Sequence, residues 1–194
     1  MARLTPQRPA PSTQVRGLPA QSTGQPYDIV ELVMADHRRI RHLARAVDDA
    51  ARYTAGPDWV LAVAWQRLAA LLQVHTRAEE EVCYLPMFGS AGLTAGRMRE
   101  AVSCHEDMRD AISEASLQCA GSPPWWCAVQ AVLAASAEHL DHEEYVIQSS
   151  WMPRLTMSRR WELGRQWSAF AAAWRQDAPS VRHSASGRDD PAGA

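Results

Sequence analysis

Hydrophobic residues recur along most of this chain with the three-and-four spacing of amphipathic helices. The spacing predicts helices over about residues 28–53, 58–87 and 94–118, then one after the Pro123-Pro124 pair that ends near Trp151. Short segments rich in glycine, proline and serine separate these helices, so neighbours should be antiparallel. The sequence predicts an all-α fold, an antiparallel up-down-up-down four-helix bundle.

A further amphipathic pattern over residues 156–174 predicts an additional C-terminal helix packed outside the bundle. The two ends of the chain differ from this helical part. Residues 1–26 are rich in proline, glutamine, threonine and glycine, and residues 175–194 are rich in proline, serine, glycine and aspartate. Both compositions favour disorder. We therefore expect one helical domain, residues 27–174, between a disordered N-terminal arm and a disordered C-terminal tail.

Polar residues occupy core positions of the second predicted helix. Its inward-facing positions, spaced by four and three residues, are Leu68, Leu72, His75, Glu79 and Val82. A histidine and a glutamate one helical turn apart therefore interrupt an otherwise apolar stripe. This pattern points both side chains into the bundle.

The other three helices carry the same kind of interruption. Between Val132 and Val146 the spacing repeats, with His139 and Glu143 at the polar positions. His37 and His105 are single histidines in the apolar stripes of the first and third helices. Burying unpaired imidazoles and carboxylates costs several kcal/mol each, so a core holding six of them needs something that pairs them all. Metal ions can do so.

The predicted metal ligands are thus His37, His75, Glu79, His105, His139 and Glu143. We place His37 with His75 on one metal and the other two histidines on a second. Glu79 and Glu143 would bridge the two metals, at a separation of about 3.5–4 Å. Imidazole with carboxylate donors suits iron, manganese or zinc. Neither the Glu-x-x-His motif of ferritin-like bundles nor the His-Glu-x-x-His motif of zincins occurs.

The order of these residues, His, His-x-x-x-Glu, His, His-x-x-x-Glu, resembles the hemerythrin-like family of HHE cation-binding domains. Three local stretches carry the resemblance over about residues 27–174: residues 36–40 (DHRRI), residues 75–80 (HTRAEE) running into residues 85–88 (LPMF), and residues 139–144 (HLDHEE). The resemblance implies an antiparallel four-helix bundle that holds a bridged di-iron centre. It thus implies two iron ions as the cofactor, ahead of manganese or zinc.

One departure from the family bears on function. Oxygen-carrying hemerythrins use a fifth histidine one turn after the third-helix ligand, where this chain has Arg109. A site with fewer nitrogen ligands favours activation of dioxygen or peroxide over reversible carriage. His142 could replace the missing histidine. Glu80 and Glu144, directly after the two predicted bridges, are either partners that orient the ligands or ordinary surface charges.

Three functional classes follow. The favoured one is an oxidoreductase that acts on dioxygen or peroxide, with a small-molecule substrate and an electron donor as possible partners. The alternative is a non-enzymatic sensor, carrier or store of oxygen, nitric oxide or iron. A purely structural metal site fits least, because structural sites rarely leave coordination positions open.

Composition narrows the remaining choices. The 20 basic and 22 acidic residues nearly balance, and no basic face for nucleic acid is evident. No apolar run reaches the roughly 18 residues needed to cross a bilayer, and no signal-peptide pattern begins the chain. The 4 cysteines form no C-x-x-C pair, so we expect reduced thiols. A cytoplasmic protein with neither a nucleic-acid nor a membrane partner is expected.

Overall fold

The computed structural model describes residues 28–52, 58–85 and 94–177. Within these ranges every regular element is helical, which confirms the predicted all-α class. The long helices are α1 (Ile29–Arg52), α2 (Asp58–Ala78), α4 (Ala95–Leu117), α5 (Pro123–Val146) and α7 (Met157–Asp177). No helix in the described part is both long and apolar enough to cross a membrane.

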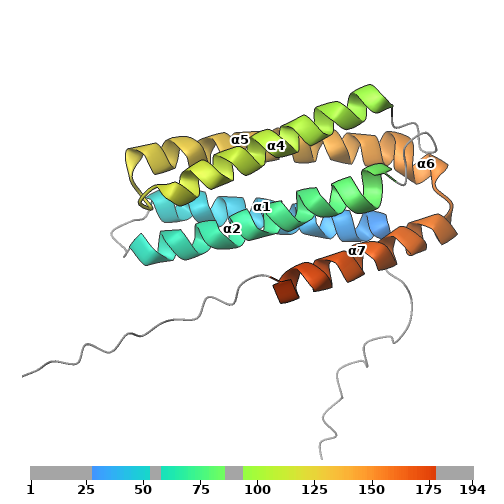
Figure 1. Cartoon of the computed structure of the whole chain (residues 1–194), viewed down its shortest axis with the longest axis horizontal. Helices are drawn as coiled ribbons and strands as arrows, with labels where there is room; N and C mark the ends of the chain where they lie inside the picture. The colour runs from blue at the N-terminus through green and yellow to red at the C-terminus, as the bar shows by residue number, and fades with distance from the viewer. Residues whose placement is uncertain (1–27, 53–57, 86–93, 178–194) are drawn as a thin grey trace, which may run out of the picture.

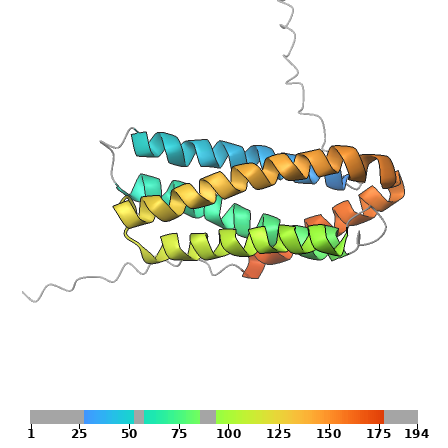
Figure 2. The same ribbon diagram turned by 90° about the horizontal axis from the view of Figure 1, so that it is seen from above.

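The helices lie side by side as a bundle (Figures 1 and 2). The most extensive packing joins α1 to α2 and α4 to α5, which are the pairs that follow one another in the chain. Helix α7 packs against α1 and α2 on the outside of the bundle (Figure 1). The additional C-terminal helix expected from the sequence is therefore present beside the first two helices.

Helix boundaries follow local capping chemistry. The hydroxyls of Thr94, Ser122 and Thr156 accept hydrogen bonds from backbone N–H groups three residues later, at the starts of α4, α5 and α7. These starts lie within about two residues of the predictions. At its other end α7 continues to Asp177, three residues past the predicted Trp174. The predicted N-terminal arm and most of the predicted tail lie outside the described residues, and so does the predicted end of the second helix at Met87.

Two wide helical turns were not predicted. After α2 the chain continues as η1 (Glu79–Tyr84), and after α5 as η2 (Ile147–Trp151), both π-helical. A short helix, α6 (Met152–Arg154), follows η2, so the chain stays helical a few residues beyond the predicted end near Trp151. Wide turns of this type are rare and often occur at functional sites. The first of them begins at a predicted metal ligand.

Two apolar clusters fill the bundle, and the polar core positions lie between them. On α1, His37 falls between Val33, which belongs to one cluster, and Ile40, which belongs to the other. On α2, His75 falls between Leu72 and Ala78 in the same way. The predicted ligands therefore occupy a middle layer of the bundle, closed off by apolar side chains on both sides.

Candidate metal centre

The six predicted ligands converge in one buried cluster. His37 and His75 are contributed by α1 and α2, Glu79 by the first residue of η1, His105 by α4, and His139 and Glu143 by α5. Each of the six is buried, and the largest exposed fraction among them is 7%. We call these residues the His/Glu cluster: His37, His75, Glu79, His105, His139 and Glu143.

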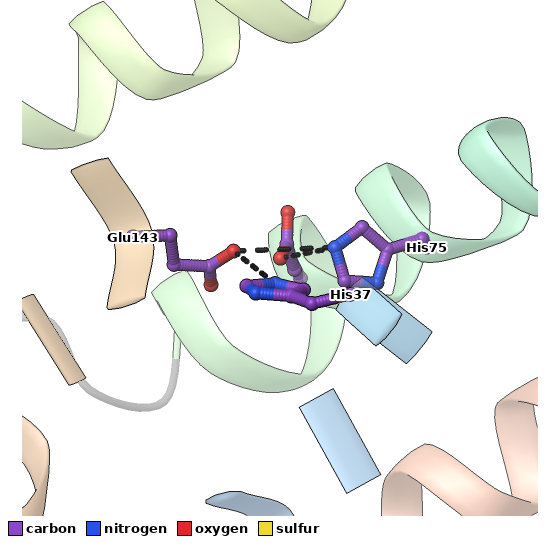
Figure 3. Close-up of side chains that lie close together, drawn as sticks. His37, His75 and Glu143 are labelled. Atoms are coloured by element: carbon purple, nitrogen blue, oxygen red, sulfur yellow. Dashed lines mark hydrogen bonds and ion pairs between the residues drawn. The ribbon is translucent and has the colours of Figure 1, made fainter. Parts of the chain in front are cut away.

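Four members form one candidate metal-binding group. Ligand atoms of His37, His75, Glu79 and Glu143 all lie within 4.8 Å of one another. His75 Nε2 is 2.9 Å from Glu79 Oε1, and His37 Nε2 is 3.2 Å from Glu143 Oε2. Figure 3 shows His37, His75 and Glu143 pointing toward one another from three different helices. His37 and His75, which the sequence analysis assigns to one metal, thus lie in the same candidate group.

The second candidate group consists of Glu79, His105 and His139. Glu79 Oε2 lies 3.2 Å from His105 Nε2 and 3.3 Å from His139 Nε2. One oxygen of Glu79 therefore faces His75, and the other faces His105 and His139. Glu143 Oε2 lies 3.2 Å from His37 Nε2 and 3.6 Å from His139 Nε2, so it too stands between the groups.

Unpartnered polar atoms indicate that the cluster suits a metal. In the described part of the chain, all buried side-chain nitrogen and oxygen atoms without a hydrogen-bond partner belong to this cluster. They include Nε2 of His75, His105 and His139 and both oxygens of Glu79. Several of these atoms approach one another closely, yet without hydrogen-bond geometry. Because leaving such atoms unpaired is costly, the donor set fits cations bound among them.

Charge distribution within the cluster is uneven. Burial favours the neutral form of Glu79, but the neighbouring His75, Glu143 and His139 outweigh it and hold the pKa of Glu79 well below its usual range. Burial and the nearby Glu79 charge raise the pKa of Glu143. In the metal-free protein Glu143 therefore takes up a proton more readily than Glu79.

The two histidines on the His-x-x-x-Glu motifs respond alike. Burial disfavours the charged form of His75 and of His139, yet the carboxylate of Glu79 outweighs burial and raises the pKa of both. Metal binding requires these imidazoles to be unprotonated at Nε2. Protons therefore compete with metal ions at this cluster.

Glu80 and Glu144 are partners of cluster histidines rather than surface charges. Glu144 Oε1 lies 3.0 Å from Nδ1 of His37, and Glu80 Oε1 lies 3.0 Å from Nδ1 of His105. Burial alone would raise the pKa of each carboxyl, but hydrogen bonds from arginine and histidine together lower both pKa values. These contacts are the ones expected of carboxylates that orient metal ligands, which is the first of the two alternatives raised by the sequence.

Arg109 does not face the centre in place of a fifth histidine. Its Nη1 donates to Glu80 Oε1 at 2.7 Å, outside the His/Glu cluster. His142 is exposed and belongs to neither candidate metal group. It does line the cavity described next, together with His139 and Glu143. The structure thus brings His142 near the centre without adding it to the ligands.

A cavity of about 200 Å³ opens beside one half of the cluster. Its wall includes His139 and Glu143, along with apolar surface from Ala101, Val146 and Trp151. The opposite half is covered. The ring of Trp167, on α7, meets the ring of His75 edge-on at 5.6 Å between centroids. A small molecule in the cavity therefore reaches the side of the cluster that contains His139.

Comparison with known families agrees with this geometry. The family profile described as hemerythrin HHE cation binding domain matches residues 28–149. The chain belongs to this family. The match spans α1 to α5 and contains the whole His/Glu cluster, and it ends before α7. No curated protein and no solved structure matches the chain significantly. The chain is thus a hemerythrin-type metal-binding domain with a helix beyond the matched region that covers a cluster histidine.

Proposed function

We propose that this hemerythrin-family domain is a non-haem di-iron protein that acts as an oxidoreductase on dioxygen or peroxide. His37 and His75 would hold one iron, and His105 and His139 would hold the other. Glu79 and Glu143, which lie between the two histidine groups, would be the carboxylates shared by both irons. We further propose that α1, α2, α4 and α5 form an up-down-up-down bundle. The extensive packing of α1 on α2 and of α4 on α5 supports this topology.

Iron bound in this cluster would supply a redox-active Lewis acid that accepts small oxygen-containing ligands. Manganese and zinc fit the same donor atoms, and family membership favours iron among the three. The protein contributes the rest of the site. The cluster is closed to solvent on the α7 side, and the cavity gives one route to it at His139 and Glu143.

The cavity is the observation that carries the enzymatic proposal. A purely structural metal site would be enclosed and saturated by protein ligands. Here a space large enough for peroxide or a small organic molecule touches two cluster residues, His139 and Glu143. Tyr84 also lines the cavity, and its ring stacks on His105. Burial and nearby carboxylates raise the pKa of Tyr84 well above its usual value, so its hydroxyl stays protonated as a hydrogen-bond donor.

Peroxide decomposition is the reaction that requires no further substrate or electron donor at this site. Two molecules of hydrogen peroxide give two of water and one of dioxygen, so electrons balance without an external donor. Oxidation of another substrate by dioxygen would need that substrate, or a separate reductant, to supply electrons. We therefore place peroxide decomposition first among the oxidoreductase reactions.

A non-enzymatic sensor or store is the second candidate. The observation that favours it is the contact between Trp167 and His75, because it joins a cluster residue to a helix outside the matched family region. A change at an iron bound by His75 would then alter the packing of α7 through Trp167. This role predicts reversible binding without turnover.

The test is iron loading of the purified protein under anaerobic conditions, followed by rapid mixing with oxygen and then with peroxide. The proposal expects two irons per chain and repeated release of dioxygen from peroxide, measured with an oxygen electrode. The variant His75→Ala should lose both properties, whereas His42→Ala, at an exposed histidine of α1, should keep them. Reversible optical changes without turnover would support the sensor role instead.

A further inference from the structure

Two identical groups of three side chains flank the His/Glu cluster. On one side, His37 and Arg41 lie one turn apart on α1, and both donate to the same oxygen of Glu144. His37 Nδ1 is 3.0 Å from Glu144 Oε1, and Arg41 Nη1 is 2.5 Å from it. Glu144 follows the cluster residue Glu143 directly in α5.

The second group repeats the first with residues from other helices. His105 and Arg109 lie one turn apart on α4, and both donate to Oε1 of Glu80, at 3.0 Å and 2.7 Å. Glu80 follows the cluster residue Glu79 directly in η1. A histidine and an arginine four residues apart thus meet the second glutamate of a Glu-Glu pair in both groups.

Burial separates these groups from ordinary surface ion pairs. Exposed pairs of arginine and carboxylate contribute little to stability. Here the side chains of Arg109 and Glu80 are 18% and 15% exposed, those of Arg41 and Glu144 are 30% and 23% exposed, and the histidine of each group is fully buried. A carboxylate in such a position keeps a fixed orientation when a second donor holds it. Arginine is that donor in both groups.

The contacts between Nδ1 and a carboxylate favour one of the two neutral forms of each imidazole. A neutral imidazole has one N–H and one free lone pair. When Nδ1 donates its proton to a carboxylate, the lone pair is on Nε2, which in His37 and His105 points into the cluster. The carboxylates alone would impose this tautomer only while they face the histidines.

We propose that Arg41 and Arg109 are positioning residues: each fixes the carboxylate that holds the Nδ1 proton of the histidine one turn before it, leaving Nε2 free to bind metal. The proposal rests on the proposed function for the ligand role of His37 and His105. Neither arginine would contact a metal. It assigns a purpose to Arg109, which stands where oxygen-carrying relatives have a histidine.

The two groups differ in the additional partners of their arginine and glutamate side chains. We therefore expect the two arginine substitutions to have effects of different size. Arg41 also donates to Asp141 at 2.8 Å, so Glu144 depends on a single arginine that is shared with another carboxylate. Glu80 accepts a further bond at 3.3 Å from Arg77. Because Arg77 backs up Arg109, removal of Arg41 should disturb His37 more than removal of Arg109 disturbs His105.

The experiment uses the full-length chain labelled with ¹⁵N, without metal and then loaded with Zn²⁺ as a diamagnetic probe. Long-range ¹H–¹⁵N spectra report the protonated nitrogen of each histidine. In the wild-type protein His37 and His105 should carry the proton on Nδ1. In Arg41→Gln the signal of His37 should shift toward a tautomer mixture, with His105 unchanged, and Arg109→Gln should do the converse more weakly.

Metal affinity gives the second readout. Loss of a partner that orients a metal ligand typically weakens binding by about 10–100-fold, and we expect this range for Fe²⁺ binding to Arg41→Gln. Arg41→Lys should recover much of it, because lysine keeps the cation. Arg45→Gln, at an exposed arginine one turn further along α1, is the matched control and should match wild type.

Unchanged tautomers and affinity in both glutamine variants would overturn the proposal, and so would equal changes in Arg45→Gln. The tautomer spectra need no metal and no activity, so they separate this proposal from the proposed function. If the wild-type chain binds no iron, the proposed function is wrong. If it binds iron and the glutamine variants leave the histidine tautomers unchanged, only the positioning role is wrong.

Discussion

The two His-x-x-x-Glu motifs are alike in sequence and differ in their surroundings. His75 is fully buried and lies under Trp167 of α7, whereas His139 is 7% exposed and lines the cavity. The motif itself fixes which atoms converge, because a spacing of four residues puts both side chains on one helix face. The side chains packed around each motif determine whether small molecules can reach it. The His75 side of the cluster is therefore covered by α7, and the His139 side borders the cavity.

The largest effect is expected from removing Glu79, which contacts histidines of both candidate metal groups. Glu79 presents one oxygen to His75 and the other to His105 and His139, so Glu79→Ala should abolish binding at both proposed metal positions. Iron content after anaerobic loading, measured by mass spectrometry, should fall from about two per chain to near zero. Exposed Glu81, two residues along in η1, supplies the control Glu81→Ala. Retention of one iron would mean that Glu79 is not a bridge.

The second test uncovers the His75 side of the cluster by removing Trp167. Trp167 is 3% exposed, and truncation of a buried tryptophan costs about 3–5 kcal/mol. We expect Trp167→Ala to lower the free energy of unfolding by an amount in this range, and to speed iron release to a chelator. Trp174→Ala removes a tryptophan from the same helix at 37% exposure and should have a much smaller effect. Equal chelator rates in the two variants would argue that α7 does not shield the centre.

The third test fills the cavity beside His139. Ala101 lines the cavity from α4, so Ala101→Trp should fill much of the space in front of His139. Iron content should stay at the wild-type level while the rate of peroxide decomposition falls about tenfold, equivalent to about 1.4 kcal/mol in the barrier. Ala131→Trp, at an exposed position of α5, is the control. An unchanged rate with full iron content would mean that peroxide enters by another route.

The last prediction concerns the anchor of α7. Asp28 accepts a backbone hydrogen bond from Val30 and pairs with Arg160 of α7, which ties the covering helix to the start of α1. Arg160→Gln should cost about 1–2 kcal/mol, measured by denaturant unfolding. Arg165→Gln, exposed on the same helix, should be near neutral. Faster iron release in Arg160→Gln would sharpen the claim that α7 covers the centre.

The His/Glu cluster could be predicted because each of its residues occupies a core position of a strongly periodic helix. The spacing of His75 and Glu79, repeated by His139 and Glu143, determines helix face directly. The helix starts could be predicted for a similar reason, since capping residues act within a few positions of the chain.

Other features depend on contacts between distant segments, which periodicity does not encode. Trp167 reaches His75 only because α7 folds back over α1 and α2. The π-helical turn at Glu79 changes the local register within an apparently regular pattern. The proposed role of Arg41 had a signal in the sequence, because Arg41 follows His37 by the four residues that separate His105 from Arg109. Comparison of the two single-histidine helices would have suggested it.

The most direct test of the proposed di-iron centre is Mössbauer spectroscopy of the protein loaded with ⁵⁷Fe and oxidised, together with its iron content. Two bridging carboxylates between two irons predict two irons per chain whose spins are coupled, giving no magnetic splitting at low temperature in a weak field. One iron per chain, or two irons with the magnetic spectra of isolated ferric ions, would contradict the assignment of Glu79 and Glu143 as bridges.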